Sequence, residues 1–179
     1  EWLVDRGVSE DALKRIFPRP DYFNIARMTP YGEDWVGFMN SVGMGCLRGR
    51  VDSFFKGEDW TEAYAAATGF ETSLEEMRRA ARRNWNLLKA LNVRLGFSRK
   101  DDVFPDRWFA PLETTDRGTM VLSDYFGTPL SRQDCEKLLD DYYDERGWDI
   151  RTGIPTAETL IEYGLEDVAQ DLKRRKRIE

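Results

Sequence analysis

The sequence predicts an all-α fold, which we expect to be an irregular helical domain with a long central loop. Three observations predict it. Apolar side chains recur at helical spacing in several segments, most regularly from Ser73 to Leu95. Helix-capping residues and glycines stand at the ends of these segments. Between the predicted helices, Gly96–Pro129 is rich in Pro, Gly and Asp and has no helical periodicity.

The sequence of the first part of the chain predicts short helices and a glycine-rich bend. Ser9 is a suitable N-cap for a helix that runs to Phe17, where two nearby prolines stop it. Residues 21–32 are predicted to be a loop and residues 33–39 a helix. This helix enters a segment with three glycines within residues 43–49, where we expect an unusual backbone path that brings the main chain close to another group.

Two capping boxes mark the next helices. Asp59-Trp-Thr-Glu62 is expected to open a helix that Gly69 ends. Ser73-Leu-Glu-Glu76 opens the longest predicted helix, which runs to Leu95. At about 1.5 Å per residue this helix is more than ~30 Å long and spans the domain.

The central loop separates this long helix from three predicted C-terminal helices. Within the loop we expect at most a short extended piece near residues 120–122, and so long a loop indicates a functional or partner-facing role. The helices are expected at residues 131–145, residues 155–163 and from Leu165 onward. The last helix ends in the basic run Lys173–Arg177, which suits the negative end of a helix dipole and favours a solvated terminus over nucleic-acid contact.

Composition excludes several classes of function. The 179 residues include 33 acidic and 27 basic side chains, scattered along the chain, so no nucleic acid is expected as a partner. No apolar stretch approaches the roughly 20 residues that cross a membrane, so no membrane association is expected. Two distant cysteines and no apparent signal peptide favour a reducing, cytoplasmic location. The absence of histidine removes the commonest general base and metal ligand.

Two clusters of charged residues admit both a chemical and a structural interpretation. The acidic cluster Asp140, Asp141, Asp144 and Glu145 has the residue types of an acid–base or hard-metal site, but its position on an amphipathic helix favours a solvated face. Asp101 and Asp102 lie close to Arg99, Lys100 and Arg107 in the loop. Such a cluster can bind a ligand, although ion pairs that hold the loop in place are favoured.

The two cysteines have different surroundings. Cys46 lies in the glycine-rich bend, where a thiol has the access that a metal–sulfur cluster requires, although the residues alone favour a buried structural thiol. Cys135 falls within a helical period and is predicted to be a core residue. Two cysteines cannot by themselves complete a four-thiolate site.

Several motifs, in order and over about half of the chain, resemble the C-terminal region of aldehyde ferredoxin oxidoreductases. Asn92-Val-Arg94-Leu-Gly96 and Asp101-Asp102-Val-Phe-Pro105-Asp-Arg107 are similar to the family's Asn-x-Arg-x-Gly and Asp-Asp-x-x-Pro-x-Arg runs. Residues 142–149, residues 152–156 and Gly164-Leu-Glu-Asp-Val-Ala169 resemble its closing signature. The ordered set is specific, whereas each motif alone is weak.

The resemblance implies an all-α domain like the C-terminal helical domain of these enzymes. The parent would be a tungsten or molybdenum enzyme with a bis-pterin cofactor and a 4Fe-4S cluster, which oxidises aldehydes to carboxylic acids and passes electrons to ferredoxin. This chain would pack against upstream domains of the same protein, cover the cofactors from one side and carry no catalytic residue. No cofactor is expected on the isolated chain.

The resemblance also places the cofactor-facing residues. The family's Asp-x-x-Gly-Leu-Cys segment matches Asn40-Ser-Val-Gly43-Met44-Gly45-Cys46, which assigns Asn40, Gly43 and Met44 to the pterin and Cys46 to the cluster. Asn replaces Asp here, so one acceptor of the pterin contact becomes a donor. The cysteine also falls one residue late. Arg146, Trp148 and Asp149 match the closing signature, and a structural clamp between the last three helices is favoured for them.

Two other functions remain open alternatives. One is a helical interaction or assembly module that kept the fold and lost the cofactor, and the other is a tungsten subunit that acts on another substrate such as an aryl-CoA. The start at Glu1 without Met favours a C-terminal piece of a longer chain. We expect residues 1–179 to form one helical domain, with a cofactor-facing part (1–58), a long helix and covering loop (59–130), and C-terminal helices (131–179).

Overall fold

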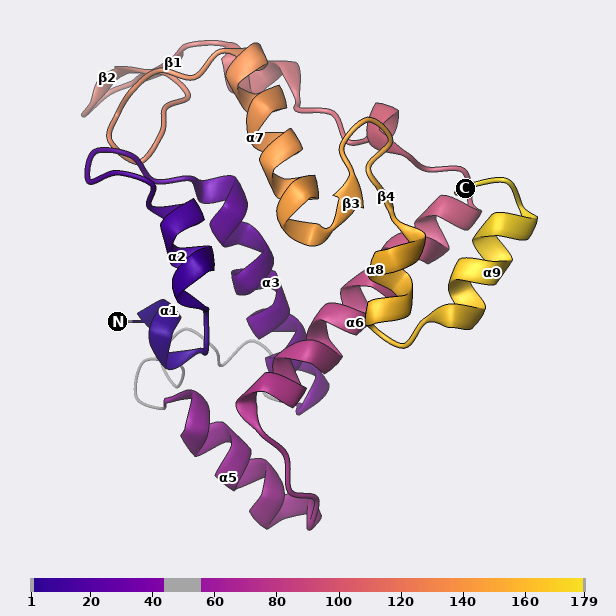
Figure 1. Cartoon of the computed structure of the whole chain (residues 1–179). Coiled ribbons are helices and arrows are strands. Elements are labelled where there is room, and N and C mark those ends of the chain that lie inside the picture. Colours follow the sequence, from indigo (N-terminus) through magenta and orange to yellow (C-terminus); the bar gives the residue numbers. More distant parts are fainter. Residues whose placement is uncertain (1, 44–55, 179) are drawn as a thin grey trace.

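The computed structural model describes residues 2–43 and 56–178, which are mainly helical, so the all-α prediction is confirmed (Figure 1). In chain order the helices are α1 (Trp2–Asp5), α2 (Glu10–Ile16), α3 (Ile25–Ser41), α5 (Gly57–Thr68), α6 (Leu74–Arg94), α7 (Arg132–Arg146), α8 (Ala157–Glu162) and α9 (Glu166–Arg174). Strands β1 (Leu112–Thr114) and β2 (Gly118–Met120) form one antiparallel pair, with Leu112 opposite Met120. Strands β3 (Trp148–Asp149) and β4 (Ile154–Pro155) form a second antiparallel pair, with Trp148 opposite Pro155. No helix in these two ranges is long and apolar enough to cross a membrane.

Helix α6 packs against helices from both the N-terminal and the C-terminal part of the described chain (Figure 1). Helices α3 and α5 contact it, α9 and β4 also pack against it, and α7 packs on α3. The buried apolar residues of the described chain fall into three separate clusters rather than one core. The first joins α3, α5 and α6 through Trp35, Phe38, Met39, Trp60, Met77 and Ala81. The second joins α6 to the C-terminal helices through Ala90, Val93, Leu160, Leu165, Ala169 and Leu172. The third lies around α1 and α2 and contains Leu3, Val8, Ala12 and Ile16.

Helix α6 begins as the sequence predicts. The Ser73 hydroxyl accepts a hydrogen bond from the Glu76 backbone N–H at 3.2 Å, and the Glu76 carboxylate accepts from the Ser73 N–H at 2.8 Å. The predicted apolar face is only partly buried. Met77 and Ala81 belong to the first cluster, but the leucines at 88, 91 and 95 are 46%, 45% and 77% exposed.

The prediction of a loop at residues 21–32 is wrong, because α3 begins at Ile25. The Asn24 side chain caps this helix by accepting from the Arg27 N–H at 3.1 Å. Pro30 lies inside the helix, where a proline removes one backbone hydrogen bond and locally disfavours helix. Its side chain is fully buried, so tertiary packing outweighs the local preference.

The predicted start of the next helix is also wrong by three residues, since the N-cap is Lys56. Helix α5 begins at Gly57, and Asp59 is its third residue rather than its N-cap. The Asp59 carboxylate reaches back and accepts from the Lys56 N–H at 2.6 Å. The predicted end at Gly69 is confirmed, since this glycine adopts a left-handed conformation with φ of 77°.

The central loop contains more structure than predicted. Two 3-10 turns, Arg99–Asp101 and Asp106–Phe109, precede the β1–β2 hairpin. The expected extended piece near Met120 corresponds to β2. The three helices predicted after the loop are all present, with Ser131 and Thr156 as side-chain N-caps of α7 and α8.

A close approach of backbone explains the glycine at the start of α5. A Cβ atom at Gly57 would lie 2.5 Å from the Asp5 carbonyl oxygen and 2.6 Å from a Leu74 methyl carbon. We therefore expect Gly57→Ala to lower the free energy of unfolding by about 1–3 kcal/mol, through overpacking. Gly32→Ala is the matched control, because Gly32 is helical and has no atom within 4 Å of its Cβ position. It should be neutral or stabilising by up to about 1 kcal/mol. Urea unfolding measures both, and equal effects of the two variants would contradict the explanation.

Candidate cofactor-facing site

The predicted cofactor-facing residues that the structure describes lie at the C-terminal end of α3. Asn40 is on the last turn of the helix and is exposed, and Gly43 follows directly after it. The Gly43 N–H donates to the Asn40 carbonyl oxygen at 3.2 Å. Met44 and Cys46, the other two predicted site residues, lie outside the described residues, so the structure does not test their roles.

The geometry at this helix end is compatible with contact to a flat polar heterocycle. Gly43 adopts φ of 82°, and no atom of residues 2–43 or 56–178 lies within 4 Å of its Cβ position, so these residues leave the backbone there open to an approaching group. Within the described residues the Asn40 amide makes no hydrogen bond, which leaves one acceptor and two donors for the edge of a pterin. The described residues contain no group of three or more His, Cys, Asp or Glu side chains that could hold a metal ion.

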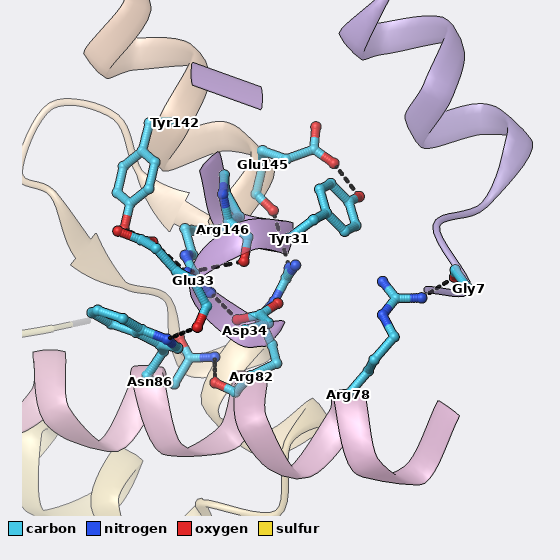
Figure 2. Close-up of polar contacts among 12 residues, drawn as sticks. Gly7, Tyr31, Glu33, Asp34, Arg78, Arg82, Asn86, Tyr142, Glu145 and Arg146 are labelled. Carbon is cyan, nitrogen blue, oxygen red and sulfur yellow. Dashed lines mark hydrogen bonds and ion pairs between the residues drawn. The ribbon is translucent and has the colours of Figure 1, made fainter. Parts of the chain in front are cut away.

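A buried arginine fixes the helix that carries these residues. Arg146, the last residue of α7, has no exposed side-chain surface. Its guanidinium contacts Asp34 at 2.6 Å and Glu33 at 2.5 Å, both on α3 (Figure 2). Two carboxylates from one helix therefore hold one cation from another. Burial by itself lowers the pKa of this guanidinium, but the two nearby carboxylates raise the pKa by a larger amount. The net pKa is therefore above the usual value, and the guanidinium stays charged.

Helix α6 joins the same network through Arg82. The Arg82 Nε atom contacts the second oxygen of Asp34 at 2.5 Å, so Asp34 is shared by two arginines from two helices (Figure 2). Glu33 is held in a similar way. Its carboxylate accepts from the Tyr142 hydroxyl at 2.8 Å, and its carbonyl oxygen accepts from the Trp85 indole N–H at 3.0 Å. Both carboxylate oxygens of the buried Asp34 are thus paired with arginines, as a buried charge requires, while Glu33 is partly exposed and shares one oxygen between Arg146 and Tyr142.

A second network ties the start of α3 and α2 to α7. The Glu145 carboxylate, only 2% exposed, contacts Arg15 at 2.6 Å and Arg27 at 3.1 Å, and it accepts from the Tyr31 hydroxyl at 2.6 Å. Arg27 also pairs with Asp141 at 2.7 Å and with Asp144 at 2.8 Å.

The acidic cluster of α7 is therefore largely not a solvated face. That interpretation is wrong for Glu145, which is buried, and for Asp141, which pairs with a half-buried arginine. The sequence could not show this, because Arg15 and Arg27 lie more than 110 residues away from their partners. Asp140 pairs with Arg99 of the loop at 2.6 Å.

The expected clamp at residues 146–149 exists, but it joins different helices. Arg146 binds α3 rather than the last two helices. The Trp148 indole N–H donates to the Asn86 side chain of α6 at 2.7 Å, and both residues are buried. The Asn86 amide in turn donates to the Arg82 carbonyl oxygen at 3.1 Å. Asp149 organises its own turn by accepting from the Thr152 N–H at 2.9 Å.

The loop charges form ion pairs, as the structural interpretation predicts. Asp102 contacts Lys89 of α6 at 2.8 Å and accepts from the Tyr143 hydroxyl at 2.5 Å. Arg99 pairs with Glu136 at 3.0 Å and donates to the Ile150 carbonyl oxygen at 2.7 Å. These contacts hold the start of the central loop against α6 and α7. Cys135 is buried as predicted, and burial raises the pKa of its thiol.

Sequence reasoning missed Glu33, Asp34 and Arg82 as the residues that set the position of α3. One signal was available. Asp34 lies next to Trp35 and four residues before Phe38, on the apolar side of a predicted helix. A charged residue in that position needs a buried partner.

The comparisons with known proteins agree with this architecture. The family model "Aldehyde ferredoxin oxidoreductase, domains 2 & 3" matches residues 7–165. Among solved structures, the chain is similar to a chain of the active site complex BamBC of benzoyl coenzyme A reductase in complex with 1,5-dienoyl-CoA, with a TM-score of 0.52 and 28% identity. This similarity covers 68% of the present chain and 16% of that chain, so the present chain spans less than a fifth of that relative.

These matches define the class as an oxidoreductase-type domain with a mainly helical fold. The chain belongs to the aldehyde ferredoxin oxidoreductase family. The resemblance seen in the sequence motifs is therefore confirmed. For the parent enzymes, membership of this family implies a tungsten or molybdenum pterin and an iron–sulfur cluster.

The Arg146 network predicts a large stability effect. Arg146→Met should lower the free energy of unfolding by about 3–5 kcal/mol, because it leaves Glu33 and Asp34 buried without their shared cation. Arg132→Met is the matched control, since the Arg132–Asp106 pair is exposed and should contribute little. Chemical denaturation of the two variants beside the wild type measures the difference. A small effect of Arg146→Met would show that the network does not stabilise the fold.

The Glu145 network predicts a dependence on pH. Burial by itself raises the pKa of the Glu145 carboxyl. The hydrogen bonds from Arg15 and Tyr31 lower the pKa by a larger amount, so the net pKa lies below the usual value. Burial and the same contact raise the pKa of Tyr31 to about 12. A lowered pKa in the folded state stabilises the fold above the unfolded-state pKa, and this stabilisation is lost as the pH falls through the folded-state value.

We therefore expect Glu145→Gln to be destabilising at pH 7, with a difference from wild type that shrinks below about pH 4. The exposed Glu62→Gln serves as control and should differ little from wild type at any pH. Denaturation midpoints between pH 7 and pH 3 measure both. A constant difference for Glu145→Gln over this range would rule out the proposed ionisation.

Proposed function

We propose that the chain is the C-terminal helical part of an oxidoreductase that oxidises an aldehyde to a carboxylic acid and passes electrons through a 4Fe-4S cluster to ferredoxin. The family match over residues 7–165 is the observation that supports it most directly. In the parent, a tungsten or molybdenum bis-pterin would supply the redox chemistry, and the cluster would carry the electrons. In this proposal the described residues of this chain fix the position of α3, whose C-terminal end faces the pterin and the cluster. They contribute no acid–base catalyst.

In this proposal the bend after α3 covers the cofactors. Asn40 and Gly43 would contact the pterin, since the first offers an unpaired amide and the second an open backbone. Met44 would lie beside them, and Cys46 would be a ligand of the cluster. The remaining ligands and most of the pterin site would come from upstream domains. Residues 1–58 would form the cofactor-facing part, and residues 59–130 and 131–179 its support.

The surface area of the chain supports assembly with other protein. The accessible surface is 11877 Å², whereas a compact monomer of 20.9 kDa exposes about 9000 Å². Large apolar side chains outside the pocket described below, such as Leu95 and Phe70, are more than two-thirds exposed. We infer that other domains of a larger oxidoreductase cover part of this surface.

The proposal is tested on the full-length protein, purified without oxygen. We expect tungsten or molybdenum together with about four irons, and reduction of ferredoxin that depends on an added aldehyde. Cys46→Ala should lose iron and cluster absorption. Cys135→Ala is the matched control and should retain both, because Cys135 is buried within α7. Metal-free protein would contradict the enzyme assignment and favour the interaction module.

A second candidate is a tungsten subunit that acts on an aryl-CoA. The 28% identity to a chain of the benzoyl coenzyme A reductase complex favours it. The aldehyde-oxidising and the aryl-CoA candidates differ in the substrate that they turn over. Assays of the same metal-loaded protein with both kinds of substrate therefore distinguish them. Turnover of benzoyl-CoA or its dienoyl product without turnover of aldehydes would favour the aryl-CoA candidate.

A further inference from the structure

An aromatic pocket lies between α6, α7 and the first part of the central loop, and neither Asn40 nor Gly43 lines it. Its volume is about 440 Å³, within the size range of small-molecule sites. Six of its 14 lining residues are aromatic, namely Trp85, Phe104, Trp108, Tyr142, Tyr143 and Trp148. The loop wall is accessible, because Trp108 is 52% exposed and Val103 is 72% exposed.

Four of these six aromatic side chains have their polar atoms engaged inside the protein. The Trp85 and Tyr142 side chains both donate to Glu33. The Tyr143 hydroxyl donates to Asp102, and the Trp148 indole N–H donates to Asn86. These four residues therefore present ring faces and C–H edges to the pocket. Such a wall selects a planar apolar group rather than a group that needs hydrogen bonds.

The charged residues of the pocket select against an anion. Lys89 is its one lining cation, and this ammonium is paired with Asp102 and lies 5.2 Å from the centre of the Trp148 ring. Asp101 also lines the pocket, where its carboxylate accepts from the Ser98 N–H at 2.9 Å and forms no ion pair within the described residues. One carboxylate is thus left without a counter-charge beside a set of aromatic faces. This combination attracts cations.

We propose that this pocket binds a planar aromatic group that is neutral or positively charged. The ring would stack against Trp108 and Phe104 on the loop side, with Trp85 and Leu88 of α6 opposite. A positive charge on the ligand would lie toward Asp101. The proposal does not depend on the proposed function, since it uses none of the cofactor-facing residues and needs no metal.

The test uses the 179-residue chain with three probes of similar shape. These are the 1-methylquinolinium cation, neutral indole and the 1-naphthoate anion. The ¹⁵N–¹H signals of the six tryptophan indoles report the site of binding, with each signal assigned by a single Trp→Phe variant. We expect shifts at Trp85, Trp108 and Trp148 but not at Trp35, and a dissociation constant about tenfold lower for the cation than for the anion.

Two variants and one control test the residues that carry the argument. Trp108→Ala should weaken binding of the cation and of indole by about tenfold, since a stacking face is lost. Asp101→Asn should reduce the preference for the cation over the anion while retaining indole binding. Tyr125→Ala removes an aromatic residue outside the pocket that is even more exposed than Trp108, and it should change nothing. Circular dichroism confirms that each variant keeps its helical content.

Two outcomes would overturn the proposal. One is the absence of shifts at the three pocket tryptophans at millimolar probe, or shifts of equal size at all six indoles. The other is equal affinity for cation and anion together with no effect of Trp108→Ala. Either result leaves the proposed function untouched, because metal content and aldehyde turnover are measured separately.

Discussion

The Arg146 guanidinium, buried between Glu33 and Asp34, holds together helices that hydrophobic packing alone leaves loosely connected. The described chain has three separate apolar clusters, and none of them contains a residue of α7. Cys135 and Tyr143 of α7 are buried outside these clusters, and ion pairs and hydrogen bonds join α7 to α3 at both ends of the contact. Because a buried charge without its partner is far more costly than an exposed one, these contacts also impose one relative position of the two helices.

That constraint reaches the candidate site through the length of α3. The helix has 17 residues and so extends about 25 Å, with its start fixed by the Glu145 network and its middle by the Arg146 network. Asn40 and Gly43 lie beyond both anchors, and among the described residues no atom lies within 4 Å of the Gly43 Cβ position. A rigid support with an open end is suited to a residue that must meet a group held by another part of the protein.

The central loop has a second role in this architecture. Its charged start is pinned to α6 and α7 by Asp102 and Arg99, and this pinning brings Trp108 and Phe104 opposite Trp85. The ion pairs that the sequence led us to regard as purely structural therefore also build the wall of a pocket. Holding a loop in place and shaping a ligand site are consequences of the same contacts.

The sequence by itself determined the helical class, the N-caps of α2 and α6, and the family, because periodicity, capping and ordered motifs are local signals. It also located Asn40 and Gly43 at the end of a helix. Only the tertiary structure decided that α3 starts at Ile25 despite Pro30, that Glu145 is buried, and that α6 exposes three leucines. Each of these depends on partners far away in the chain, and the energy of burying a charge or a proline is set by those partners rather than by sequence neighbours.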